Sequence, residues 1–187
     1  PATYTEQDNE AQTLTIELSD TVCGLRVFLD YTAYEKQNVI TRSVRLENQS
    51  NEDLTLLRAL SACVDFEGKD FTMLSLSAGY ARERYPLTAP LTQGIHAVES
   101  RRGNSSHQHN PFLALLRGNA DENHGEVYGF SLVYSGNFAA TAEVTHYNNT
   151  RVTVGINPFD FSWLLTPGES FQTPEMVMVL SLIHISE

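Results

Sequence analysis

The chain has 187 residues and 41% of them are hydrophobic, which is enough for one domain with a buried core. The 23 acidic residues outnumber the 12 basic ones, so the net charge of -11 argues against nucleic acid and against an anionic membrane surface as partners. No stretch approaches the roughly 20 apolar residues that would cross a bilayer. Only two cysteines, Cys23 and Cys63, are present, and they are too few for a disulfide framework. A reducing compartment is therefore expected.

Apolar and polar residues alternate with a period of two in four runs, at residues 14–18, 25–29, 40–47 and 159–165. Such alternation is typical of half-buried antiparallel strands. Turn-forming sequences separate the runs at intervals of about ten residues, which indicates a sandwich of antiparallel strands. The stretch 51–66 has the pattern of an amphipathic helix or of a strand. We expect a strand, because Leu60, Ala62, Val64 and Phe66 share one face and the preceding "ENQSNED" is typical of a hairpin turn.

Residues 78–111, "AGYARERYPLTAPLTQGIHAVESRRGNSSHQHNP", are predicted to form a long irregular segment. They gather four arginines in an otherwise acidic protein. Long irregular segments on a β scaffold often carry function. Tyr80 and Tyr85 lie in this segment, where no core is expected, and an aromatic ring on a loop can bind the apolar face of a sugar.

His107 and His109 would point to one face of a strand and could begin a metal site, but such a site needs three or four ligands. We favour a loop whose side chains satisfy backbone groups. Ser105 and Ser106 lie beside His107 without a nucleophile motif, so they are not predicted to be catalytic. Carboxylates such as Asp65 and Glu67 mostly lie in turns, where they are solvated. Asp160 is predicted to hold a turn after Asn157-Pro158.

Four long segments appear together in one order: "YTAYEKQNVITRSVRLEN", "ESRRGNSSHQHNPFLALLR", "GEVYGFSLVYSGNF" and "GINPFDFSWLLTPGESFQTPE". Together they resemble the amino-terminal domain of bacterial α-galactosidases of glycoside hydrolase family 36. The resemblance runs from Pro1 to about Val179.

The resemblance implies an all-β fold, an antiparallel β-sandwich of the supersandwich, galactose-mutarotase-like type. In the family this domain precedes a catalytic (β/α)8 barrel, whose two aspartates hydrolyse terminal α-galactosides such as melibiose and raffinose with retention. The resemblance implies no cofactor and no metal. It also implies a cytoplasmic homo-tetramer in which the amino-terminal domain supports oligomer contacts, its own catalytic barrel and the rim of the sugar pocket.

The resemblance divides the chain into residues 1–179, a partial amino-terminal domain truncated at both ends, and residues 180–187. This last stretch, "LSLIHISE", is predicted to be an unrelated tail that arose by truncation or as an assembly artefact. Because the barrel and both catalytic aspartates are absent, no catalytic residue is predicted here and the chain alone is expected to be inactive.

One residue of the family's pocket can be transferred to this sequence. The family places an aromatic residue, usually Trp, in the loop before "RERW", and "AGYARERY" puts Tyr80 at that position. Tyr80 is therefore the predicted substrate-binding residue. Two alternatives remain: a stand-alone carbohydrate-binding module, which needs a complete aromatic platform, and a metal-dependent enzyme using His107 and His109, which needs a third ligand.

Overall fold

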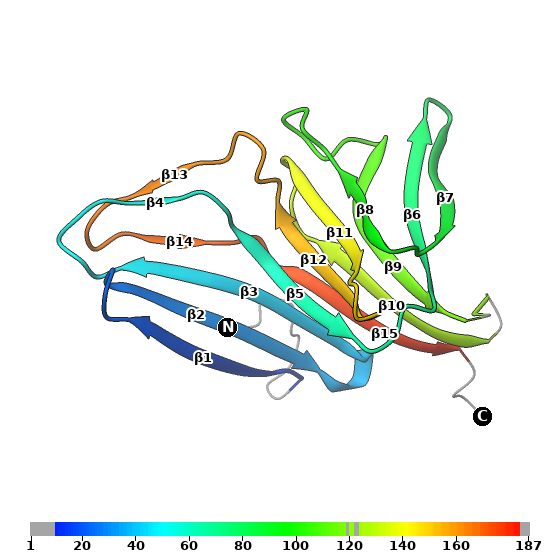
Figure 1. Cartoon of the computed structure of the whole chain (residues 1–187), viewed down its shortest axis with the longest axis horizontal. Coiled ribbons are helices and arrows are strands. Elements are labelled where there is room, and N and C mark those ends of the chain that lie inside the picture. The colour runs from blue at the N-terminus through cyan, green and yellow to red at the C-terminus, as the bar shows by residue number, and fades with distance from the viewer. Residues whose placement is uncertain (1–9, 119, 122–123, 184–187) are drawn as a thin grey trace.

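The computed structural model describes residues 10–118, 120–121 and 124–183. These residues form fifteen strands and one short 3-10 helix, and every strand pairing is antiparallel (Figure 1). The elements are β1 (Gln12–Asp20), β2 (Leu25–Tyr34), η1 (Glu35–Gln37), β3 (Val39–Asn48), β4 (Leu54–Leu56), β5 (Leu60–Phe66), β6 (Phe71–Gly79), β7 (Arg82–Pro90), β8 (Gly94–Glu99), β9 (His109–Arg117), β10 (Gly125–Leu132), β11 (Phe138–Val144), β12 (Thr150–Ile156), β13 (Trp163–Leu165), β14 (Ser170–Gln172) and β15 (Met176–Ile183).

The strands form two packed sheets and a small extension. The large sheet has the order β1-β2-β3-β15-β10-β9-β6-β7, with β14 also paired to β3. A four-stranded sheet, β5-β12-β11-β8, packs on it. The small extension is the pair β13-β4, which lies next to the end of the large sheet that β1, β2 and β3 form (Figure 1). The predicted all-β antiparallel sandwich is confirmed.

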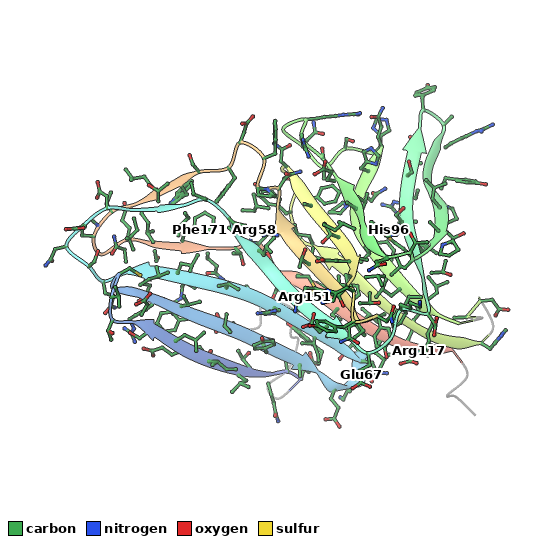
Figure 2. All side chains as sticks on the ribbon, in the orientation of Figure 1. Arg58, Glu67, His96, Arg117, Arg151 and Phe171 are labelled. Atoms are coloured by element: carbon green, nitrogen blue, oxygen red, sulfur yellow. The ribbon has the colours of Figure 1, made fainter. Side chains whose placement is uncertain are left out.

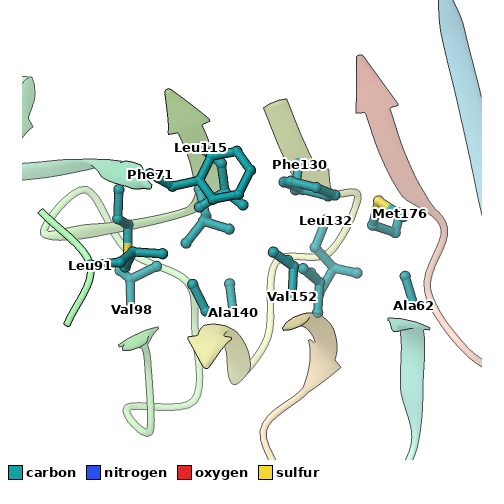
Figure 3. Packing of buried hydrophobic residues seen from close by; sticks show 14 of the residues in the cluster. Ala62, Phe71, Leu91, Val98, Leu115, Phe130, Leu132, Ala140, Val152 and Met176 are labelled. Carbon is teal, nitrogen blue, oxygen red and sulfur yellow. The ribbon is translucent and has the colours of Figure 1, made fainter. Parts of the chain in front are cut away.

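The core lies between the two larger sheets, where large side chains meet small ones (Figure 3). Phe130 and Leu132 of β10 and Leu115 of β9 face Ala140 of β11 and Val152 of β12. This pairing lets the sheets approach and fill the space at the density of a native core. The core thus depends on β5, β8, β11 and β12 as much as on the large sheet.

The stretch 51–66 is strand, as predicted, and Ala62, Val64 and Phe66 all contribute to the core. The predicted hairpin at "ENQSNED" is wrong. β3 pairs with β2, β15 and β14, whereas β4 pairs with β13. The Asn48 side chain stabilises this loop instead, because its Nδ2 donates to Glu52 O at 2.7 Å and to Leu165 O at 2.8 Å.

Two further expectations need correction. Residues 159–162 are a turn and an irregular stretch, so only Trp163–Leu165 of the predicted strand at 159–165 exists. Residues 78–111 are mostly strand, since they contain β7 and β8, and their longest irregular stretch is 100–108. Pro86 and Pro90 are unfavourable in a central strand, so the sequence did not indicate β7. The structure places β7 at a sheet edge, where a missing amide donor is tolerated.

The predicted boundary at residue 179 falls inside β15. Residues 180–183 continue the ladder with β10, with Leu180 opposite Tyr128 and Ile183 opposite Gly125. Residues 184–187 lie outside the described residues. The unrelated origin of residues 180–187 therefore stays a prediction.

β1 is confirmed as a strand, but its apolar row is exposed. Leu14, Ile16 and Leu18 are 60%, 40% and 50% accessible on one face of this edge strand. Three neighbouring apolar side chains on an unpaired edge favour self-association. We expect the chain to associate at high concentration.

Replacing Leu14, Ile16 and Leu18 together by threonine should shift the sedimentation coefficient towards that of a monomer, because threonine keeps the strand propensity but removes the apolar row. Threonine at the scattered exposed residues Val22, Leu57 and Ile95 is the control and should leave association unchanged. If the β1 variant and the unsubstituted chain associate equally, the exposed row on β1 is not the surface through which the chain associates.

Candidate functional site

The candidate site is built around the β6–β7 hairpin, whose tip carries Tyr80. Gly79 pairs with Arg82, so Tyr80 and Ala81 form a two-residue turn. The Tyr80 side chain is 96% accessible. Such a ring contributes nothing to the core and is free to bind a ligand.

The backbone of this hairpin is held in an unusual conformation. Ala81 and Arg84 adopt positive φ angles of 63° and 59°, which are sterically costly for residues with a Cβ. The register shifts between the Ser77–Tyr85 and Gly79–Arg82 pairs, so β7 holds one extra residue as a bulge. A bulge twists a hairpin and redirects its side chains. The direction of the tip is thus built into the backbone.

The loop 100–108 lies beside the hairpin and is bonded to it. Gln108 O accepts hydrogen bonds from Ala78 N and from Ser77 Oγ, both at 3.2 Å. Ser105 N donates to Ser135 O at 2.9 Å, and Gly103 N donates to Asn137 Oδ1 at 2.6 Å. The loop is therefore attached on both sides.

The Asn157 side chain anchors the start of this loop through buried hydrogen bonds. Its side chain is 2% accessible, and its Nδ2 donates to Glu99 Oε2 at 3.0 Å, Ser100 O at 3.2 Å and Phe138 O at 3.3 Å. Its Oδ1 accepts from Phe159 N at 3.0 Å. Buried backbone groups need such partners, so Asn157 joins the 157–161 turn to the 100–108 loop.

Two open cavities flank the hairpin. One, of about 430 Å³, lies along the hairpin itself and is lined by Ser77, Ala78, Gly79, Arg82, Glu83, Tyr85 and Leu87. The other, of about 560 Å³, lies between the hairpin and the loop and is lined by Glu83, Arg84, Ser106, His107 and Asn110. Both combine charged and hydroxyl groups, and the second adds the Asn110 amide; such groups can bind hydroxyls of a neutral ligand.

The sequence matches the family model for the glycosyl hydrolase family 36 N-terminal domain over residues 1–166. The chain belongs to this family. It is 61% identical over 181 residues to alpha-galactosidase AgaA of Geobacillus stearothermophilus, covering 97% of this chain and 25% of the relative. It is 42% identical to alpha-galactosidase Mel36A of Lactobacillus acidophilus, again covering 97% of this chain and 25% of the relative.

Solved structures agree with this assignment to family 36. The crystal structure of AgaA from Geobacillus stearothermophilus superposes with a TM-score of 0.95 at 60% identity, covering 98% of this chain and 26% of that one. A variant of the same enzyme in complex with raffinose gives the same TM-score, identity and coverage. The chain spans about a quarter of the length of these relatives.

His107 and His109 do not share a strand face. His107 lies in an exposed turn, and His109 is the first residue of β9. Over the described residues, no three His, Cys, Asp or Glu side chains are grouped closely enough to hold a metal ion. The metal-dependent alternative thus lacks its third ligand within that part of the chain.

The structure also places the other residues that the sequence singled out. Tyr80 and the 100–108 loop come together at one end of the molecule. Tyr85 lies on β7 rather than in a loop and lines the hairpin cavity. Asp160 lies in the predicted turn with a φ of 56°, and a backbone bond from Phe161 N to Pro158 O at 3.3 Å closes that turn. The described residues include no helix long and apolar enough to cross a membrane.

Sequence reasoning missed the anchoring role of Asn157 and Asn137. Both side chains act through backbone groups of residues far away in the chain, so no local pattern marks them. The Asn157-Pro158 pair was recognised only as a turn signal. The side-chain contacts that make Asn157 an anchor span 19 to 58 residues, and the contact of Asn137 with Gly103 spans 34 residues, so both appear only in the fold.

Proposed function

We propose that this domain serves an α-galactosidase that hydrolyses terminal α-galactosides such as melibiose and raffinose with retention. Its role is non-catalytic. The catalytic aspartates belong to the barrel of the complete enzyme, and the domain supports the rim of the sugar pocket and the assembly of a homo-tetramer. The relatives' names as α-galactosidases, one with raffinose bound, support this proposal.

The observation that carries the proposal is the position of Tyr80. Its ring is fully accessible at the tip of a hairpin whose direction is set by a bulge and by bonds to the 100–108 loop. A ring presented in this way stacks on the apolar face of a galactose unit and orients it without taking part in proton transfer. The adjacent carboxylate, guanidinium and amide groups of Glu83, Arg84 and Asn110 suit the sugar hydroxyls.

We expect Tyr80→Ala in the complete enzyme that carries this domain to lower kcat/KM for melibiose by about tenfold, because an aromatic contact contributes on the order of 1 kcal/mol. Tyr80→Trp should retain activity, since it restores the ring that is usual in the family. We would measure kcat and KM by steady-state kinetics with melibiose and raffinose.

The matched control is Leu57→Ala, another exposed apolar residue, which should leave kcat/KM unchanged. Melting temperatures of the same samples separate binding from folding. A lowered melting temperature with unchanged kinetics in Tyr80→Ala would remove Tyr80 from the pocket rim.

A further inference from the structure

We propose that the four-stranded sheet carries a second sugar-binding site, formed around Tyr147, Arg151 and Asp65. It occupies the end of the sandwich opposite to the tip of the β6–β7 hairpin (Figure 1). A cavity of about 230 Å³ opens there, lined by Asp65, Phe66, Glu67, Tyr147, Asn149 and Arg151 among others. Glu67 and Arg151 lie at this end of the molecule in Figure 2.

Tyr147 forms the aromatic wall of this site. It lies in the turn between β11 and β12 and is 76% accessible. The turn is closed by Asn148 N donating to Thr145 O and by Thr145 N donating to Asn149 O, both at 2.9 Å. The His146 ring lies against the Tyr147 ring with a centroid distance of 3.8 Å. The backbone and a neighbouring ring thus hold Tyr147 in place although it packs against no core.

Arg151 and Asp65 form the polar wall. They lie directly opposite each other on β12 and β5, and Arg151 Nε and Nη2 donate to the two carboxylate oxygens at 2.6 and 2.9 Å. Hydrogen bonding from Arg151 lowers the pKa of Asp65, so both groups are charged at neutral pH. A two-point bond of this kind fixes the plane of both groups. The remaining N–H groups and carboxylate lone pairs stay available to a ligand.

This combination of groups suits a neutral pyranose ring. Sugar hydroxyls donate to Asp65 and Glu67 and accept from Arg151, while the C–H face of the ring packs on Tyr147. An anionic ligand fits poorly, because two carboxylates outnumber the single guanidinium. The cavity is smaller than the roughly 300–1,000 Å³ of sites for drug-sized ligands, which suits one sugar ring. The site needs no barrel and no second subunit, so the inference does not rest on the proposed function.

The test is a titration of the isotope-labelled 187-residue chain with melibiose, galactose, maltose and cellobiose, followed by amide chemical shifts. At least one of these sugars should shift the amides of Tyr147, Arg151 and Asp65 with a millimolar Kd. Tyr147→Ala should weaken that binding by about tenfold, the scale of one aromatic contact. Tyr147→Phe, which keeps the ring, should retain binding.

Arg151→Leu is a second variant that removes the polar wall and should also weaken binding. Tyr80→Ala is the control and should leave these shifts unchanged. The inference is overturned if none of the four sugars shifts these amides, if Tyr147→Ala and Arg151→Leu both bind like the unsubstituted chain, or if shifts occur only at the hairpin tip. Kinetics of the Tyr80 variants in the complete enzyme test the proposed function separately, so either idea can fail without the other.

Discussion

Truncation of Phe130 to alanine is expected to lower the free energy of unfolding by about 3–5 kcal/mol. Phe130 is 1% accessible and lies at the centre of the core between the two larger sheets (Figure 3). Its ring meets the Phe66 ring edge-on, with centroids 6.1 Å apart, so truncation removes a contact between the sheets as well as buried area. The strands around it are fixed by their ladders, and the cavity would not close.

Urea denaturation followed by circular dichroism measures this loss. Phe130→Leu keeps most of the volume and should cost about 1 kcal/mol. Tyr147→Ala, which truncates an exposed ring, is the matched control and should change the unfolding free energy by less than about 0.5 kcal/mol. A loss below about 1 kcal/mol in Phe130→Ala would mean that the two sheets do not depend on this contact.

Replacement of Asn157 by alanine is expected to cost about 2–3 kcal/mol, since it leaves the Ser100 carbonyl without its buried donor. It also removes one of the two donors to the Phe138 carbonyl, which keeps its bond from Ser100 N at 2.9 Å. Its effect should concentrate on the 100–108 loop. Amide hydrogen exchange at Gly103 and Ser105 should accelerate more than exchange in β9 or β10, because the loop loses its anchor while the ladders remain.

Asn157→Asp is the sharper variant. It keeps the shape of the side chain but replaces the donor with a carboxylate that faces Glu99 Oε2 and two carbonyl oxygens. We expect it to destabilise the domain at neutral pH at least as much as alanine does. Asn51→Ala, at an exposed loop residue, is the control. Unchanged exchange in the loop of Asn157→Ala would show that the hairpin and Ser135 hold the loop without Asn157.

These two variants address different parts of one arrangement. Phe130 packs between the two sheets. Asn157 bonds the start of the 100–108 loop, which lies beside the Tyr80 hairpin, to the four-stranded sheet. If Tyr80 forms the rim of a sugar pocket, Asn157→Ala in the complete enzyme should weaken galactoside processing through loop mobility rather than through a lost sugar contact. Its KM and kcat would then change while Tyr80 itself remains in place.

Much of the architecture followed from local patterns. Alternation with a period of two predicted strands at residues 14–18, 25–29 and 40–47, and the shared face of Ala62, Val64 and Phe66 favoured strand over helix at residues 51–66. These predictions succeeded because the face that a strand side chain occupies is a local property. The long segments shared with family 36 also identified the domain and pointed to Tyr80.

Other features required the tertiary structure. Which strands pair is decided by contacts far apart in the chain, so β3 and β4 are separated although a turn sequence joins them. Pro86 and Pro90 suggested a loop, but β7 lies at a sheet edge where proline costs little. Leu14, Ile16 and Leu18 have the pattern of a buried face, and only the packing of the sheets shows that they are exposed.

The sequence by itself thus determined the class of fold, the family and the residue to test first, because each depends on local periodicity or on contiguous matching segments. The tertiary structure alone decided that Tyr80 projects at a strained hairpin tip and that Asn157 anchors the neighbouring loop. It also brought Tyr147, Arg151 and Asp65 around one cavity. The physical reason is that bulges, buried side-chain amide bonds and cross-strand ion pairs join residues up to 117 positions apart, and no local pattern records such contacts.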